Sequence, residues 1–260
     1  MNGTTLILNA SEGRIQLVLA QERTILCCQD WSAPSKGTEL LTPVLADTLQ
    51  RLGMVPTDIE RIACVAGPGS FTGLRLVLTT AAAFRRATGI PVAALNALQA
   101  LAASLPAPLL GTPCRVRVLT HARRDLVHGQ DFTVAAPGAL PVPVGEPAMW
   151  DLETACDFSL GVPHILMGSG VARNLPVLRE ACSRSGATPI LLTDHDHPAP
   201  HALLNLTLAL AATAWVQQDL EPLYLRPCDA VDNLASIAAK RGQAPEEAYA
   251  ELHRLLKPSL

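Results

Sequence analysis

The sequence predicts an α/β protein made of two α/β subdomains and a helical tail. Short apolar runs alternate with helical patterns along most of the 260 residues, and a proline-rich stretch at 106–113 separates two such alternations. Hydrophobic residues make up 49% of the chain, which is enough to bury a sizeable core. We expect one subdomain over 1–105 with a returning helix in about 200–227, a smaller subdomain over 112–198, and the tail over 228–260.

Three strands are expected at the start of the chain. They cover Thr5–Leu8, Ile15–Leu19 and about Thr24–Cys28, and tight connections between them predict a meander. In the second strand, apolar residues alternate with Gln16 and Val18, a pattern typical of a half-buried strand.

A helix is expected next, within Thr38–Leu52. Its apolar residues recur at helical spacing, and Gly53 follows as a stop signal. Pro43 leaves two arrangements open. Either it occupies the first helical turn with Thr42 as the cap, or the helix begins earlier and kinks.

The rest of the first subdomain follows the order βββαβα(β). Arg61–Ala66 is an apolar strand expected to be buried on both faces. A glycine-rich turn then leads into a second helix, about Thr72–Ala87, and Pro91–Ala94 forms a short strand.

The smaller subdomain shows a weaker pattern. The expected strands are Arg115–Leu119, Leu126–Phe132, His164–Met167 and Ile190–Thr193, with a helix over Pro176–Ser185. The expected irregular parts are a loop over Ala135–Pro147 and a short helix near Trp150–Cys156. A long Ala/Leu helix, about Ala202–Gln217, then returns to the first subdomain, and two short helices are expected from Asp232 onward.

Composition excludes several classes of function. A net charge of −3 and only nine aromatic residues argue against a protein that coats nucleic acid by charge or by base stacking. None of the seven cysteines forms a CxxC pair, so they are expected to be reduced core thiols. The chain shows neither a signal peptide nor an apolar run long enough to span a bilayer, which predicts a cytoplasmic protein without a membrane partner.

The strongest local signal is a glycine-rich segment between a strand and a helix. Its glycines permit positive φ and close approach of another backbone or a ligand, and the free N–H groups of the helix start favour an anion. The alternative is a tight turn that binds nothing, because the P-loop lysine and the GxGxxG spacing are both missing. The candidate residues for an anion or nucleotide contact are Gly67, Gly69, Ser70, Phe71, Thr72 and Gly73.

Neither a metal site nor a hydrolase site is predicted. His197 and His201 have HxxxH spacing, but Pro198 and Pro200 oppose the helix that would bring both rings together. Ser70 does not lie in the GxSxG pattern of a nucleophile elbow. We therefore assign no catalytic and no metal-binding residue.

The second helix carries a candidate interaction stripe. It comprises Arg75, Thr79, Ala82, Ala83 and Arg86, with small residues in the middle and an arginine at each end. Small residues let a second helix approach closely, and arginines pair with carboxylates. The alternative is that the alanines only favour the helical conformation and face solvent.

The glycine-rich motif also identifies a family resemblance. Residues 66–75 read AGPGSFTGLR and residues 89–102 read GIPVAALNALQALA, and both runs closely resemble the TsaB (YeaZ) family. Glu39–Pro43 and Pro222–Pro227 are further matches, so the resemblance covers about 5–103 well and the middle of the chain weakly. The members of this family are small partners in bacterial synthesis of threonylcarbamoyladenosine on tRNA.

The resemblance implies the actin/Hsp70/sugar-kinase-like fold, with its ribonuclease H-like motif, and a non-catalytic scaffold role. Such a scaffold binds a TsaD-like transferase, recruits a TsaE-like ATPase through the complex and reaches tRNA indirectly. It has no intrinsic cofactor, and ATP or ADP is expected only within the complex. In the family, the second helix and the helix within Thr38–Leu52 would pair with the transferase or with a second copy of the chain. The implied interface residues are Thr42, Leu45, Arg75, Thr79, Ala82, Ala83 and Arg86.

Two other functions stay open. One is an independent nucleotide-dependent enzyme of the same fold, such as a small kinase or ATPase, and the other is a metallopeptidase, after the family's old M22 label. Asn9 stands where TsaB-like sequences often have Asp, and its amide lacks the anionic oxygens that a Mg²⁺-bound nucleotide prefers. Whether the glycine-rich segment binds nucleotide, and what the tail does, are left open.

Overall fold

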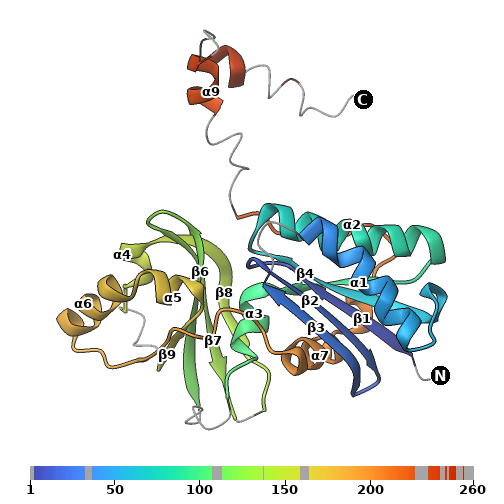
Figure 1. Ribbon diagram of the computed structural model, residues 1–260. Helices are drawn as coiled ribbons and strands as arrows, with labels where there is room; N and C mark the ends of the chain where they lie inside the picture. The colour runs from blue at the N-terminus through green and yellow to red at the C-terminus, as the bar shows by residue number, and fades with distance from the viewer. Residues whose placement is uncertain are drawn as a thin grey trace. The chain divides into compact units, whose positions relative to one another are not determined.

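The computed structural model describes residues 3–32, 37–106, 113–136, 138–158 and 164–225, together with parts of 234–254. The chain forms two compact units, Met1–Leu225 and Arg226–Leu260 (Figure 1). In the second unit the structure describes helix α9 (Leu234–Lys240). Most of the predicted tail and of the proline-rich boundary lies outside the described residues, and the boundary between the two α/β subdomains stays a prediction.

The first unit contains two five-stranded sheets. The strands of the first sheet, in spatial order, are β3 (Thr24–Ser32), β2 (Arg14–Gln21), β1 (Thr4–Asn9), β4 (Ile59–Gly67) and β5 (Val92–Asn96). The antiparallel pairs β1–β2 and β2–β3 confirm the predicted meander, and β4 and β5 extend the sheet in parallel to β1.

Helices cover both faces of this sheet. The helices are α1 (Gly37–Arg51) and α2 (Phe71–Thr88) on one face, and α3 (Ala97–Ala102) and α7 (Pro200–Ala209) on the other. The prediction of a half-buried second strand was therefore wrong. Leu17 packs in the cluster under α1 and α2, while Val18 packs in the cluster that includes α7, and both are fully buried.

Helix α1 settles the question raised by Pro43. The helix begins at Gly37, so Pro43 lies inside it rather than in its first turn. At the other end, Gly53 has a φ of +66°, and the Met54 N–H donates to Leu49 O at 2.8 Å. This left-handed glycine and its paired hydrogen bonds are the usual end of a helix, which confirms Gly53 as the stop.

The second sheet contains one strand that sequence reasoning missed. Its strands, in spatial order, are β10 (Ile190–Leu192), β9 (Ile165–Met167), β6 (Cys114–Arg123), β7 (Leu126–Val134) and β8 (Val142–Asp151). The second part of the expected loop over Ala135–Pro147, from Val142 onward, belongs to β8. Pro143 and Pro147 lie in this strand because β8 pairs only with β7, and an edge strand tolerates residues without an N–H.

The helices of this half are short. They are α4 (Leu152–Ala155), α5 (Ser169–Arg173) and α6 (Leu175–Ser185). Beneath α4, Arg117 is 4% exposed and makes a bidentate pair with Asp131 at 2.8 and 2.9 Å. The same guanidinium donates to the carbonyls of Ala155 and Asp157 at 3.0 and 2.7 Å, so α4 is fixed by a fully bonded buried charge.

Helix α3, which the sequence analysis did not identify, joins the two sheets. Asn96 Oδ1 caps the helix by accepting from the Leu98 N–H at 2.8 Å, and Asn96 Nδ2 donates to Gln130 Oε1 on β7 at 3.0 Å. From the helix itself, Gln99 donates to Pro141 O at 2.9 Å, just before β8. The two sheets of the first unit are therefore joined by side-chain hydrogen bonds from α3 and its cap, in addition to the covalent connection.

The returning helix is shorter than predicted. Helix α7 ends at Ala209 instead of Gln217. A short 3-10 helix, Ala212–Ala214, follows, and Val216 then exchanges backbone hydrogen bonds of 2.8 and 3.0 Å with Val92 on β5. Just beyond, Asp219 binds Arg85 at 2.6 Å. Pairing with β5 and α2 therefore outweighs continuation of the Ala/Leu helix.

The cysteines in the described part of the chain are free thiols. Cys64, Cys114 and Cys182 are buried as expected, but Cys28 is exposed on β3, and Cys27 and Cys156 are half-buried. Within the same residues, every helix is too short or too polar to cross a lipid bilayer.

We predict that Gly73→Ala destabilises the fold by about 2 kcal/mol or more, since overpacking of a rigid contact costs about 1–3 kcal/mol. A Cβ at Gly73 would lie 1.9 Å from Ala10 O, a backbone atom that cannot rotate away. Gly→Ala inside an exposed helix normally stabilises by about 1 kcal/mol, so the sign of the effect is diagnostic. Urea unfolding at pH 7 measures it, and a variant as stable as the wild type would contradict this packing.

Candidate protein-interaction site

The glycine-rich segment packs against the chain's own backbone. A Cβ at Gly67, which has a φ of +129°, would lie 2.7 Å from Leu223 O. At Gly69 it would lie 2.4 Å from Ser11 O, and the Ser70 N–H donates to that same oxygen at 2.7 Å. Packing of the chain against itself is therefore enough to require glycine at these two positions, and no bound ligand is needed to explain them.

Ser70 is the cap of α2. Its Oγ accepts from the Gly73 N–H at 3.3 Å, whereas Thr72 lies inside the helix. Beside this helix start is a cavity of about 310 Å³, whose polar lining includes Thr38, Ser70 and Arg14. Among the described residues of this lining, Arg14 is the cation, and it is already paired with Asp30 of the same chain at 2.9 Å.

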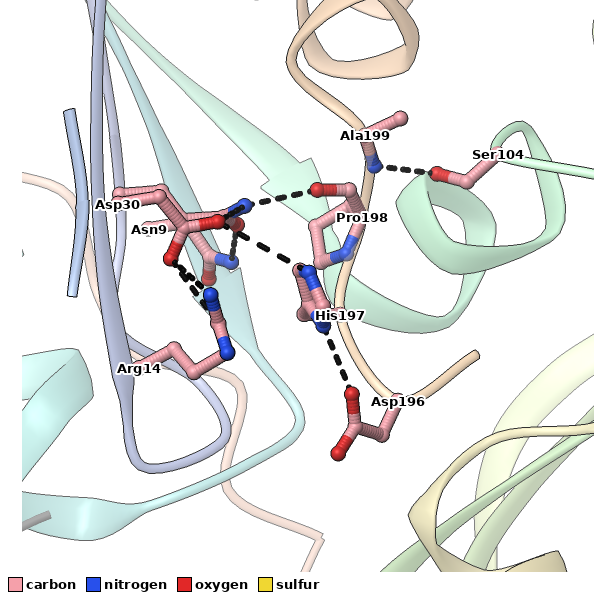
Figure 2. A network of polar contacts seen from close by, with 9 residues as sticks. Asn9, Arg14, Asp30, Ser104, Asp196, His197, Pro198 and Ala199 are labelled. Atoms are coloured by element: carbon pink, nitrogen blue, oxygen red, sulfur yellow. Dashed lines mark hydrogen bonds and ion pairs between the residues drawn. The ribbon is translucent and has the colours of Figure 1, made fainter. Parts of the chain in front are cut away.

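Asn9 belongs to a buried polar network (Figure 2). It is 2% exposed; its Nδ2 donates to Gln16 Oε1 at 2.7 Å, and its Oδ1 accepts from the Ser11 N–H at 3.0 Å. Gln16 Nε2 in turn donates to Asp30 at 3.0 Å and to Pro198 O at 2.8 Å. Both polar atoms of the Asn9 amide are therefore used to fix the turn after β1 and to connect it to the segment before α7.

The histidine cluster lies at the other end of this network. His197 Nδ1 is 2.7 Å from Asp196, and its Nε2 is 3.8 Å from Asp30 (Figure 2). His201 lies inside α7 and is exposed, while His197 precedes the helix, so the two rings do not share a helical face. Among the described residues, no three His, Cys, Asp or Glu side chains gather closely enough to hold a metal ion.

Glu12, at the tip of the β1–β2 turn, reaches the second sheet. Burial raises the pKa of its carboxyl from 4.5 to about 7; hydrogen bonds from Ser169 and Thr120 and the charge of Arg173 lower it, while Asp196 raises it. Sequence reasoning did not identify this residue, because Thr120 and Ser169 are more than a hundred residues away along the chain.

The structure divides the predicted interface residues into exposed and buried ones. On α2 the exposed positions are Arg75, Thr79, Ala83 and Arg86, with Ala82 half-buried beside them. On α1, Thr42 is exposed, but Leu45 is only 4% exposed and packs in the core with Leu41 and Leu49. Leu45 is therefore removed from the candidate interface. The buried face of α2, on the other side of the helix, consists of Leu74, Val77, Leu78 and Ala81.

Both arginines of the stripe are held by contacts within the chain. The Arg75 guanidinium lies 4.1 Å over the Phe71 ring, and its Nε donates to the Tyr224 hydroxyl at 3.2 Å. Arg86 pairs with Asp219, which also binds Arg85. The residues that follow α7 therefore fix the ends of this helix face.

We predict that Asn9→Asp destabilises the protein at pH 7 by about 1–3 kcal/mol, the cost of a buried group without its hydrogen-bond partner. The new carboxylate would face Gln16 Oε1, an acceptor, so its pKa is raised in the folded state. The loss is then present at neutral pH and shrinks as pH falls and the carboxyl regains a proton. Urea unfolding at pH 7 and pH 4.5 tests this against Asn205→Asp, the same change at an exposed position of α7. Equal effects of the two variants would contradict the assigned role of Asn9.

Glu12 predicts a second dependence on pH. Because its pKa is raised in the folded state, the folded chain holds this proton more tightly than the unfolded chain, and stability from this group is lost as pH rises from 4.5 through 7. Relative to wild type, Glu12→Gln should therefore gain about 1–3 kcal/mol between pH 5 and pH 8. Glu153→Gln, at an exposed position of α4, is the control and should show no such trend. A pH-independent difference for Glu12→Gln would rule out the buried carboxyl.

Comparison with known proteins finds similarity to proteins of tRNA threonylcarbamoyladenosine synthesis. The profile of the family TsaD, tRNA N6-adenosine threonylcarbamoyltransferase, matches residues 33–136, which include α1, β4, α2 and β5. The tRNA threonylcarbamoyladenosine biosynthesis protein TsaB of Bacillus subtilis is 28% identical over 101 residues, covering 39% of this chain and 44% of the relative. An uncharacterised protein of Mycobacterium leprae, ML0378, is 33% identical over 205 residues, covering 78% of this chain and 53% of the relative. The chain thus spans about half the length of these curated relatives.

A solved structure shows the same fold. YeaZ from Pseudomonas aeruginosa superposes with a TM-score of 0.68 at 23% identity and covers 86% of this chain and 100% of its own. The two proteins share one fold, which in this chain consists of two mixed sheets flanked by helices. In sequence the chain matches the TsaD-type profile and the TsaB protein, and in fold it matches YeaZ, so it is similar to the TsaB (YeaZ) family.

Proposed function

We propose that this chain is a non-catalytic scaffold subunit of the bacterial complex that makes N6-threonylcarbamoyladenosine in tRNAs reading codons that begin with adenine. It binds and positions a TsaD-like transferase. The similarity to the TsaB family supports a role in this tRNA modification. The observation that supports binding of the transferase is the exposed face of α2, which combines small residues with arginines held in place by contacts within the chain.

The geometry of this face suits a second helix. Helix α2 has 18 residues and is held on the first sheet by four buried side chains. Thr79 and Ala83 are exposed on the opposite side, and small side chains there let a partner helix come within about 8–10 Å, axis to axis. Arg75 and Arg86 lie about 16 Å apart along the helix, at about 1.5 Å per residue, so the small residues lie between two cations.

The family profile suggests the shape of the partner. Residues 33–136, which contain α1 and α2, resemble the transferase family itself, so a TsaD-like transferase carries a related pair of helices. Two similar helix pairs can pack face to face around an approximate two-fold axis. The same reasoning allows two copies of this chain to pair through the same face, and the homodimer then competes with the heterodimer.

The scaffold role assigns the chemistry to the partners. ATP or ADP acts only within the complex, a TsaE-like ATPase joins through it, tRNA is bound through the transferase, and assembly takes place in the cytoplasm. The main rival is an independent kinase or ATPase of the same fold. Asn9 opposes this rival, because both polar atoms of its amide are bonded inside the protein. Nucleotide hydrolysis by the isolated chain would favour the rival.

The interface predicts the effect of one added side chain. We expect the wild-type chain to form a one-to-one complex with the TsaD-like protein of its own organism, seen as a mass by light scattering. Ala83→Trp should weaken this complex roughly 5- to 140-fold, since overpacking a helix contact costs about 1–3 kcal/mol and each 1.4 kcal/mol is tenfold. Ala172→Trp, the same change at an exposed position of α5, should leave it unchanged.

Two results would refute this proposal. One is the absence of any association between the wild-type chain and the transferase, with and without nucleotide. The other is an Ala83→Trp variant that binds as tightly as wild type, which would remove α2 from the interface.

A further inference from the structure

Two sequence motifs that are about 150 residues apart meet at the start of α2. Phe71, from the glycine-rich segment, stacks on Tyr224, from the 222–227 motif, with ring centroids 5.1 Å apart and planes inclined by 21°. Arg75 completes the group: its guanidinium lies 4.1 Å over the Phe71 ring and its Nε donates to the Tyr224 hydroxyl at 3.2 Å. We call Phe71, Arg75, Leu223 and Tyr224 the aromatic–arginine cluster.

The cluster is exposed although it is largely apolar. Phe71, Leu223 and Tyr224 are 36%, 37% and 38% exposed. The stacked rings of Phe71 and Tyr224 therefore form an apolar patch at the surface, and Leu223, the neighbour of Tyr224 in the chain, is exposed as well. Such a patch on a soluble protein marks an interaction surface more often than a single exposed leucine does.

The cluster is also held in place before any partner binds. The Leu223 N–H donates to Ala66 O at 2.8 Å, and the backbone of Leu223 lies so close to Gly67 that no Cβ would fit between them. Stacking and the hydrogen bond to the Tyr224 hydroxyl restrict the rotamers of Phe71, Tyr224 and Arg75. A partner therefore does not have to order these side chains on binding, which removes one of the main costs of association.

The charge of Arg75 is left for a partner. Arg85 and Arg86 on the same helix both pair with Asp219, whereas among the described residues Arg75 has no carboxylate partner and uses only its Nε within the cluster. Tyrosine and arginine side chains are enriched at the positions that dominate binding energy in protein interfaces.

We propose that the aromatic–arginine cluster is the anchor of the partner-binding face. It receives an apolar side chain of the TsaD-like transferase, next to a carboxylate of the transferase that pairs with Arg75. This inference rests on the proposed function. The transferase is the occupant because Arg75 belongs both to the cluster and to the α2 stripe, one helical turn before Thr79, so a helix lying along the stripe also covers the cluster.

A single-stranded nucleic acid is the other class of ligand that exposed aromatic rings and arginine attract. The geometry disfavours it here, because the Phe71 ring already carries Arg75 and is stacked on Tyr224 within the chain. Nucleic acid therefore becomes an outcome of the test rather than part of the proposal.

The test compares single variants in calorimetric titrations with the transferase at low and high salt. Tyr224→Ala and Phe71→Ala should each weaken binding at least 30-fold, and Arg75→Gln should weaken it about tenfold and reduce its salt dependence. Val144→Ala, which removes a 45% exposed apolar side chain from β8, is the matched control, and we expect it to have no effect. If Phe71→Ala fails to fold, as thermal unfolding would show, Tyr224→Phe keeps the ring and should still weaken binding several-fold by releasing Arg75.

The results separate this inference from the proposed function. If wild type binds, Ala83→Trp blocks binding and every cluster variant binds like wild type, the anchor is wrong while the scaffold role stands. If wild type does not bind the transferase, both are wrong. If the cluster variants lose affinity for tRNA in a filter-binding assay but keep their affinity for the transferase, the cluster is a nucleic-acid platform and the proposal is overturned.

Discussion

The close approach of the β1–β2 turn to the start of α2 is the constraint on which the rest of the structure depends. The Ser70 N–H bonds to Ser11 O, and Gly69 and Gly73 leave room for the backbone of Ala10 and Ser11. These contacts fix the position of α2 on the sheet and so decide which of its residues face outward. The same turn carries Glu12 to the second sheet and begins the network of Asn9.

The segment after α7 gives this helix a second point of attachment. Val216 pairs with β5, Asp219 binds the end of α2, Leu223 bonds to Ala66 on β4, and Tyr224 stacks on Phe71 at the start of α2. One stretch of chain therefore holds the helix at both ends. As a result, the exposed face of α2 is a rigid surface rather than a helix attached only by its buried side chains.

Much of the fold could be predicted from the sequence, because apolar runs and helical spacing are local signals. The strands from β1 to β7 and the buried face of α2 follow from such patterns. What could not be predicted depends on distant partners. Strand β8 contains two prolines and is a strand only because β7 is beside it, and α7 stops early because Val216 has a partner on β5.

In the candidate site, too, local patterns predicted some features, while contacts with distant parts of the chain could not be predicted. Helical spacing identified the exposed residues of the α2 stripe, whereas the family resemblance implied Leu45, which belongs to the buried side of α1. Glycine content suggested a ligand at Gly69 and Gly73, where the neighbouring atoms are those of the chain's own turn. The partner of Arg75 at Tyr224 lies 149 residues further along the chain, so no local pattern contains that contact.

The prolines of β8 also affect how the protein behaves at high concentration. An edge strand with free N–H groups can add a strand from another molecule and start a growing sheet. Pro143 and Pro147 offer no N–H at two positions of this edge, and Gly145 between them has a φ of +79°, which interrupts regular pairing. The exposed Val142 and Val144 therefore lie on a strand that is a poor template for aggregation. Self-association of this chain is thereby directed away from this edge.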